Sequence, residues 1–284
     1  MLLSQFEYRF PTEDSCIDYF KDVRSKALGA CPKCGHTLMM MKLRNIMGKR
    51  ESIYKLSGTV ELDEAFFPTR MEADEKAEPM KRGAGSQRQS KVLEIVESKA
   101  VDDILRAYLE SKDIPTAMDK AAKLTKRSKR QSVKKVVHYI KMFAIDNLKA
   151  STIDALLAES VDAKAVILSD GSSSHVNLGK NFAGHIPIVE RGNVDEVVKK
   201  GLPWVHIIIG ECRNGIAAIH KEIDGRFLQL YLNEYCWKFN RRFFRDSDDP
   251  KYDLFDRLVR ISALYTSDVK WRDYTPEIED EEDL

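Results

Sequence analysis

The segment Leu56–Phe67, "LSGTVELDEAFF", constrains the fold of this chain more than any other. Apolar and polar side chains alternate along it, as they do in a β-strand. Glu61 and Asp63 therefore share one face, and the apolar Val60 lies on the other. A carboxylate on an otherwise buried strand is costly unless a cation or hydrogen bonds compensate it. The segment therefore predicts a strand with a carboxylate that is compensated by a cation or by hydrogen bonds.

Further segments predict a sheet with helices around it. The run at 165–169 is continuously apolar, which is typical of a strand buried on both faces. Strands followed by a mixture of strands and helices indicate an α/β fold with a mixed sheet. Beyond 58–67, strands are expected at 91–98, 136–145 and 165–169, and helices at 38–55, 101–110, 151–160, from Pro203 onward and at 226–244.

Two of these helices have recognisable start signals. Ser151 followed by Asp154 resembles a capping box, in which two side chains bond the first backbone amides of a helix. Pro203 suits the first helical turn, where its missing N–H is not needed. Apolar residues then recur at helical spacing, although Gly210 and Gly215 weaken a helix by about 1 kcal/mol each.

Two more carboxylates stand where a metal site could be completed. Asp170 follows the apolar strand in "AVILSDGSSSH", at the carboxyl end where α/β sites form. Glu211 lies in "LPWVHIIIGECRN", on the edge of a helix. Phosphodiester chemistry uses two divalent cations about 4 Å apart, and Mg²⁺ prefers oxygen ligands. Asp170 and Glu211 could each equally serve to cap a turn or a helix. Because side chains alternate along a strand, Glu64 lies on the opposite face from Asp63. Glu61 lies on the same face and is an alternative metal ligand to Asp63.

The chain has a net charge of +1, but its basic residues are concentrated in a few segments. Segment 120–135 is basic, 69–90 is a charged, glycine-rich loop, and the chain ends in the acidic "EIEDEEDL". Clustered cations suit DNA phosphates, although solvated loops have the same composition. The candidate contacts are Lys81, Arg82, Arg88, Lys126, Arg127, Lys129, Arg130, Arg241, Arg242 and His206, the last of which could instead face solvent at a helix start.

The cysteines predict half of a zinc site. Cys31 and Cys34 in "CPKCGH" have the spacing of a zinc ribbon, but tetrahedral zinc usually takes four ligands. Cys16 precedes this pair, and Cys212 and Cys236 lie far downstream. We therefore expect structural zinc to be incomplete or absent. No apolar run approaches the roughly 18 residues of a membrane span, and no signal peptide is recognisable, so we expect a cytoplasmic protein.

Five motifs occur in the order of a known family: "LSGTVELDEAFF", "KRGAGSQRQSKV", "LSDGSSSHVNL", "LPWVHIIIGE" and "LQLYLNEYCWKFNRRF". Over residues 42 to about 260 the chain resembles bacterial insertion-sequence transposases with an ISXO-like catalytic domain. The resemblance implies an RNase H-like fold whose mixed sheet is flanked by helices. It also implies a DDE metal triad of Asp63, Asp170 and Glu211 that holds two Mg²⁺ (or Mn²⁺) ions.

The resemblance implies an activity and a domain order. The expected reaction is cleavage of DNA at the element ends and strand transfer to target DNA, by a dimer or larger assembly in the bacterial nucleoid. The expected divisions are a partial zinc-ribbon-like segment at 1–37, a linker helix at 38–55, the catalytic domain at 56–262 and an acidic tail at 263–284.

Relatives carry a second cysteine pair and a helix-turn-helix before the catalytic domain. Here "CPKCGHT" is followed almost at once by the helix upstream of the first catalytic strand, which indicates an internal deletion. Two other functions therefore stay open. One is an RNase H-like nuclease that cuts without joining. The other is a non-catalytic DNA-binding regulator derived from a truncated transposase.

Overall fold

The computed structural model describes residues 11–12, 14–15, 38–70, 86, 88–100, 135–188, 202–220, 223–242 and 254–270. The chain divides into two compact units, Met1–Ile46 with Thr266–Leu284, and Met47–Tyr265. Within the described ranges, no helix is both long and apolar enough to cross a membrane. The expected helix at 101–110 and the cysteines of the predicted zinc site lie outside these ranges.

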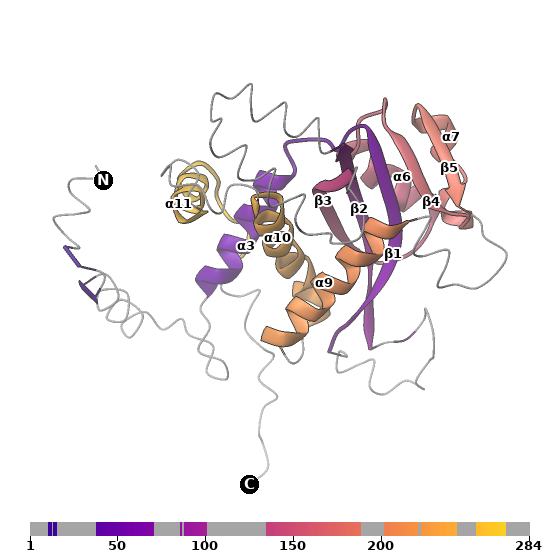
Figure 1. Ribbon diagram of the computed structural model, residues 1–284. Helices are drawn as coiled ribbons and strands as arrows, with labels where there is room; N and C mark the ends of the chain where they lie inside the picture. The colour runs from indigo at the N-terminus through magenta and orange to yellow at the C-terminus, as the bar shows by residue number, and fades with distance from the viewer. Residues whose placement is uncertain are drawn as a thin grey trace, which may run out of the picture. The chain divides into compact units, whose positions relative to one another are not determined.

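The second unit is built on a five-stranded mixed sheet with the order β3-β2-β1-β4-β5 (Figure 1). β2 pairs antiparallel with both β1 and β3, while β4 is parallel to β1 and β5 is parallel to β4. This arrangement is consistent with an RNase H-like fold, and the α/β prediction is confirmed. The strands are β1 (Thr59–Pro68), β2 (Gln89–Ala100), β3 (Lys135–Ile145), β4 (Val166–Asp170) and β5 (Gly184–Ile188).

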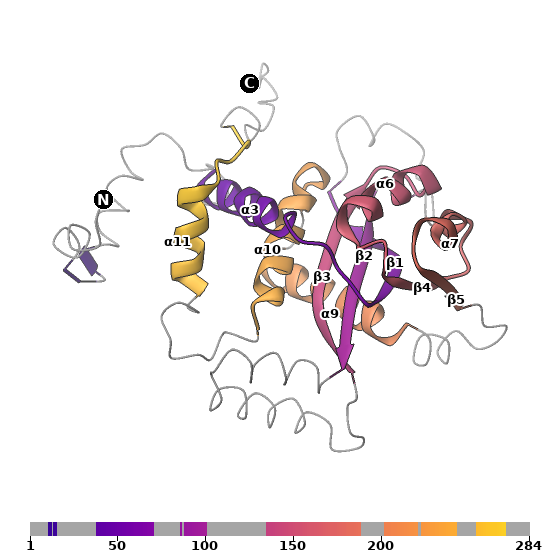
Figure 2. The same ribbon diagram turned by 90° about the horizontal axis from the view of Figure 1, so that it is seen from above.

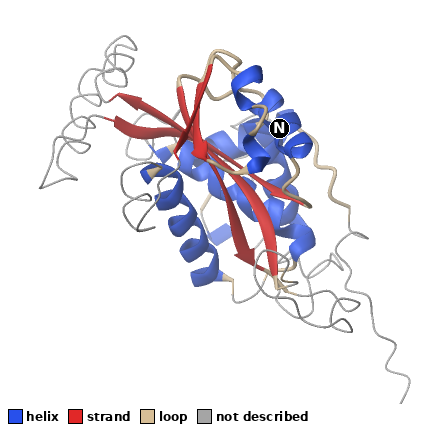
Figure 3. Cartoon of the chain, turned by 90° about the vertical axis from the view of Figure 1, so that its right-hand side faces the viewer, coloured by secondary structure: helices blue, strands red, loops and turns tan. Residues whose placement is uncertain are grey.

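Helices pack on both faces of the sheet (Figures 2 and 3). One face packs against α9 and α10, where Phe67 and Val92 of the sheet meet Val205 and Leu232. The opposite face packs against α6 and α7. The helices are α3 (Leu38–Glu51), α6 (Ala150–Ser160), α7 (Leu178–Asn181), α9 (Pro203–Ile219), α10 (Leu228–Asn240) and α11 (Leu254–Leu264), with short 3-10 turns η3 (Ser173–His175) and η4 (Gly225–Phe227).

One glycine of α3 lies directly against a side chain of α10. A Cβ atom on Gly48 would lie 2.2 Å from Nδ2 of Asn233, which is an impossible contact without movement. Gly215 of α9, by contrast, has no atom within 4 Å of such a position. The first glycine is therefore required by packing, and the second is not.

Most predicted elements are present, with three differences. The capping box is wrong: α6 begins after Lys149, so Ser151 lies inside the helix, and Oδ1 of Asn147 accepts from the Lys149 amide instead. The helix expected to reach 244 ends at Asn240. The edge strand β5 was not expected, because its "GHIPI" sequence is short and contains a proline.

Candidate active site

Asp63 and Asp170 come together from neighbouring parallel strands. Leu62 of β1 is paired with Ser169 of β4, so the next residues, Asp63 and Asp170, point to the same face of the sheet. Oδ1 of Asp63 accepts a 2.8 Å hydrogen bond from the amide of Glu64. Oδ1 of Asp170 accepts one of 3.1 Å from the amide of Ser172. Two carboxylates thus converge where β4 ends.

The two carboxyl groups have different proton affinities. Burial raises the pKa of Asp63 to about 6; the amide of Glu64 opposes this shift, and the charge of Asp170 adds to it. A hydrogen bond from His175 lowers the pKa of Asp170, against the effect of its partial burial. The oxygen donors of the two carboxyl groups fit a hard divalent cation, which would reduce the repulsion between them.

His175 links Asp170 to Glu64 and is only 1% exposed. Its Nδ1 lies 3.0 Å from Oδ1 of Asp170, and its Nε2 lies 3.1 Å from Oε1 of Glu64, an ion pair that falls short of hydrogen-bond geometry. Burial lowers the pKa of His175, but the two carboxylates outweigh burial and raise it to about 10. The ring is therefore an imidazolium at neutral pH.

These three side chains also have the spacing of a metal site. Glu64, Asp170 and His175 each present one ligand atom, and these atoms lie within 4.8 Å of one another. A protonated imidazole cannot coordinate a cation through the same nitrogen. Without a cation, His175 is a counter-charge that orients Asp170, and coordination of a cation by its ring would require the loss of a proton.

His206 reaches the same site from α9. Its Nδ1 lies 3.5 Å from Oδ2 of Asp63, and its side chain is 31% exposed. Burial lowers the pKa of His206, and the charge of Asp170 opposes that shift. The histidine is thus largely neutral at pH 7 and lies beside Asp63 instead of facing only solvent.

Glu61, the alternative ligand, caps a helix. It is 4% exposed, and its Oε2 accepts 2.9 Å hydrogen bonds from the amides of Trp204 and Val205. These amides belong to the first turn of α9, where backbone donors lack intrahelical partners and the helix dipole favours a negative charge. Glu61 thus joins β1 to α9, and its carboxylate is used to cap the helix and not to bind a metal.

Glu211 occupies an exposed position on α9. It follows His206 by five residues, which corresponds to roughly 140° around a helix. Burial raises the pKa of Tyr235 in α10, and the charge of Glu211 adds to it, so Glu211 lies near α10. Within the described residues, the side chains that interact with Asp63 and Asp170 do not include Glu211. The structure brings together two of the three predicted ligands.

Glu94 was not predicted to belong to the site, although it lies directly opposite Asp63 in the β1–β2 pairing. It is completely buried, and neither carboxyl oxygen has a hydrogen-bond partner among the described residues. Burial raises its pKa well above the ordinary value, and the charge of Asp63 adds to this effect. Burial thus favours the protonated form of Glu94, and the charge of Arg213 opposes this effect. The sequence feature that could have indicated this residue is a single acid between the apolar Leu93 and Ile95 of an expected strand.

The predicted DNA contacts have mixed outcomes. Arg241 is 8% exposed, and its guanidinium pairs with Glu51 at 2.6 Å, so it serves the fold, and its role as a phosphate contact stays a prediction. Arg242 donates to the carbonyls of Val137, His138 and Phe239, so it also serves the fold. Arg88 is exposed just before β2. The remaining predicted cations, Lys81, Arg82, Lys126, Arg127, Lys129 and Arg130, lie outside the described residues.

Comparison with known proteins identifies one family. Residues 55–240 match the ISXO2-like transposase domain. Among solved structures, the chain is similar to the Mos1 transposase paired-end complex with left transposon end, at 11% identity and a TM-score of 0.27. That match covers 79% of this chain and 68% of the other, and its low score supports no conclusion. No curated protein matches the chain significantly.

Proposed function

The chain belongs to the ISXO2-like transposase family, and on this premise we propose that it cleaves DNA at insertion-sequence ends and joins the ends to target DNA. The family implies a DDE-type enzyme that uses divalent metal. The observation that carries the proposal is the convergence of Asp63 and Asp170 on one face of the sheet, since paired carboxylates from neighbouring strands supply the anionic oxygen ligands that such chemistry needs.

Asp63 and Asp170 would hold Mg²⁺ or Mn²⁺, with Glu211 as the third ligand of the family pattern. When bound, two such ions activate a water or hydroxyl nucleophile and stabilise charge on the leaving oxygen. With its pKa near 6, Asp63 is largely ionised at pH 7 and available as a ligand. The His175 imidazolium fixes the carboxylate of Asp170 and balances the charge of Glu64. His206, which is largely neutral, can accept a proton next to Asp63.

A non-catalytic DNA-binding regulator is the second candidate. The exposure of Glu211 on α9 favours it, because within the described residues no interaction joins this side chain to Asp63 or Asp170. In the catalytic proposal, Glu211 has to turn toward Asp63 and Asp170 when cations occupy the site. In the regulator, it remains where it is and no cleavage occurs.

A strand-transfer assay with Mn²⁺ and pre-cleaved element ends tests the proposal. Joined products support a transposase, cutting without joining supports an RNase H-like nuclease, and DNA binding alone supports the regulator. Asp63→Asn and Asp170→Asn should each abolish joining while leaving DNA binding intact. The matched control is Asp146→Asn, an exposed aspartate at the end of β3. Joining by Asp63→Asn at the wild-type rate would refute the assignment.

The role of Glu211 needs its own comparison. Glu211→Gln should reduce joining at least a hundredfold if this residue completes the metal site. Glu159→Gln removes another exposed charge, from α6, and should have no effect. Equal activity of the two variants would exclude Glu211 as a ligand and leave the aspartate pair in place.

A further inference from the structure

Three carboxyl groups form a row across neighbouring strands on one face of the sheet. Glu94 of β2 is the pairing partner of Asp63 in β1, and residues directly opposite each other in an antiparallel pair point to the same face. Asp170 of β4 lies on the other side of Asp63, because Leu62 pairs with Ser169. The strands follow one another in the order β2-β1-β4, so Asp63 is the middle member of the row.

Glu94 lies in otherwise apolar surroundings. The residues two positions before and after it, Val92 and Val96, belong to the apolar cluster between the sheet and the helices α9 and α10. Glu94 is 0% exposed, and neither of its carboxyl oxygens has a hydrogen-bond partner among the described residues. Burying a carboxyl group without hydrogen bonds is costly to a fold. Packing alone therefore does not account for an acid at this position.

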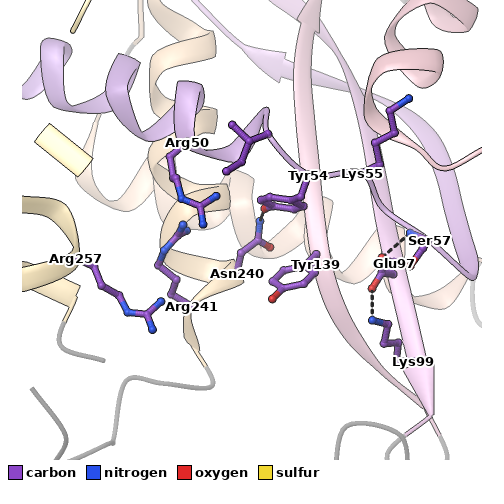
Figure 4. A pocket seen from close by; sticks show the side chains of 11 residues that line it. Arg50, Tyr54, Lys55, Ser57, Glu97, Lys99, Tyr139, Asn240, Arg241 and Arg257 are labelled. Carbon is purple, nitrogen blue, oxygen red and sulfur yellow. Dashed lines mark hydrogen bonds and ion pairs between the residues drawn. The ribbon is translucent and has the colours of Figure 1, made fainter. Parts of the chain in front are cut away.

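Glu97 shows how the same strand satisfies another buried acid. It is 1% exposed, yet it accepts a 2.6 Å hydrogen bond from the amide of Ser57 and lies 3.2 Å from Nζ of Lys99 (Figure 4). His138 adds a further contact at 2.6 Å. Two buried acids of β2 thus differ: Glu97 has hydrogen-bond and ion-pair partners, whereas the oxygens of Glu94 have no hydrogen-bond partner within the described ranges.

Arg213 of α9 is the cation whose charge acts on Glu94. Burial raises the pKa of Glu94, the charge of Asp63 adds to this shift, and the charge of Arg213 opposes it. Nε of Arg213 is itself buried without a hydrogen-bond partner among the described residues, and its guanidinium carbon lies 5.3 Å from the centre of the Phe67 ring. Arg213 thus acts on Glu94 through space and leaves both carboxyl oxygens available to another cation.

The row of carboxyl groups is open to solvent at one end. The exposed fraction rises from 0% for Glu94 to 15% for the side chain of Asp63 and 49% for that of Asp170. An ion therefore reaches the row from the side of Asp170. Neighbouring strands lie about 4.8 Å apart, which is close to the roughly 4 Å between the ions of two-metal sites. Two ions, one on each side of Asp63, fit this spacing.

We propose that Glu94 is a ligand of a second divalent cation, which it shares with Asp63, while Asp63 and Asp170 hold the first. The inference rests on the proposed function, because it assigns a further ligand to the same metal site. Hard divalent cations take oxygen ligands, and a carboxyl group gives up its proton when it binds one. The sheet alone then supplies ligands for both ions, and Glu211 adds one more when it turns toward them.

A titration of the whole chain with Mn²⁺, followed by electron paramagnetic resonance of the free ion, tests this proposal. The wild type should bind two ions. Glu94→Gln, which keeps the size of the buried side chain, should weaken the second binding step at least about tenfold, a loss that even an outer partner of a metal ligand causes. Glu97→Gln is the matched control, because it alters another buried acid of β2, and it should keep both binding steps.

The outcomes separate the two proposals. If the wild type joins DNA but binds a single ion, or if Glu94→Gln binds both ions as the wild type does, the ligand proposal is overturned and the proposed function stands. Loss of the second ion in Glu211→Gln but not in Glu94→Gln also overturns the ligand proposal. If the wild type binds two ions in a way that depends on Glu94 but joins no DNA, only the proposed function is overturned. A wild type that binds no Mn²⁺ overturns both.

A further variant distinguishes a metal ligand from an acid that acts only through Arg213. Arg213→Gln removes the positive charge that acts on Glu94, so it should leave two ions bound with equal or higher affinity. If Arg213→Gln instead weakens the second binding step as Glu94→Gln does, Glu94 acts through Arg213 and the ligand proposal is overturned. Thermal unfolding in EDTA checks that each variant is folded before its Mn²⁺ binding is compared.

Discussion

Replacement of Asp63 by asparagine should stabilise the metal-free protein. Burial raises the pKa of Asp63 from 3.8 to about 6, so ionising this side chain at neutral pH costs free energy in the folded state. A shift of about two pKa units corresponds to roughly 3 kcal/mol, and we expect about 2 kcal/mol because the buried amide retains part of the desolvation cost. In a unit of this size, that raises Tm by about 4 to 8 °C.

The stability gained by Asp63→Asn should depend on pH in a defined direction. Below about pH 4, Asp63 is protonated in the folded and the unfolded states, so asparagine brings no charge-related gain. Between pH 4 and pH 6 the folded state retains a proton that the unfolded state loses, and the wild-type protein therefore loses stability relative to the variant as pH rises. Above pH 6 the difference is constant.

Thermal unfolding in EDTA at pH 4, 5, 6 and 7 measures this difference, with Asp146→Asn as the exposed control. Comparing variants at each pH cancels the titration of the groups that do not interact with Asp63. Added Mn²⁺ should reverse the order, because a bound cation stabilises only the chain with both carboxylates. A gain of equal size at pH 4 and pH 7, or none at pH 7, would refute the reasoning.

Three further predictions concern the surroundings of the site. Glu61→Gln should destabilise the fold by about 1 to 2 kcal/mol in urea unfolding, because a charged cap on α9 becomes a neutral one; an unchanged midpoint would contradict the capping role. Gly48→Ala should cost about 1 to 3 kcal/mol because its methyl group meets Asn233, whereas Gly215→Ala should stabilise α9 by up to about 1 kcal/mol; equal effects would exclude the packing explanation. His175→Gln should weaken Mn²⁺ binding about 10- to 100-fold by calorimetry, since Asp170 loses its orienting partner, and unaltered affinity would show that His175 serves the fold alone.

Local periodicity was sufficient to predict the strands that form the centre of the sheet. The alternation in 58–67 and the apolar run at 165–169 recur as β1 and β4. Asp63 lies in the middle of β1, and the parallel pairing of Leu62 with Ser169 places it beside Asp170 at the end of β4, so the two residues meet through this register. The edge strand β5 was not predicted, because it is short and its Pro187 lacks a ladder donor.

Partners distant in sequence decided the roles that local patterns could not. Arg241 resembles a solvent-exposed cation at a helix end, but Glu51 of α3 pairs with it in the interior. His175 resembles a polar turn residue, yet two carboxylates surround it. Glu61 and Asp63 share a face of β1 and are indistinguishable by alternation, and only the position of the first turn of α9 separates a cap from a candidate ligand.

The bond between Glu61 and α9 also sets how the helix can move. Sliding of α9 along the sheet would break the two hydrogen bonds that hold its first amides. A swing of its far end, or a twist of the helix, would keep these bonds. His206 lies close to the end of α9 that Glu61 holds and keeps its place beside Asp63. Glu211 lies further along the helix, directly after Gly210, where a helix bends most easily. Any movement that carries Glu211 to the aspartate pair is therefore a rotation about the end of α9 that β1 holds.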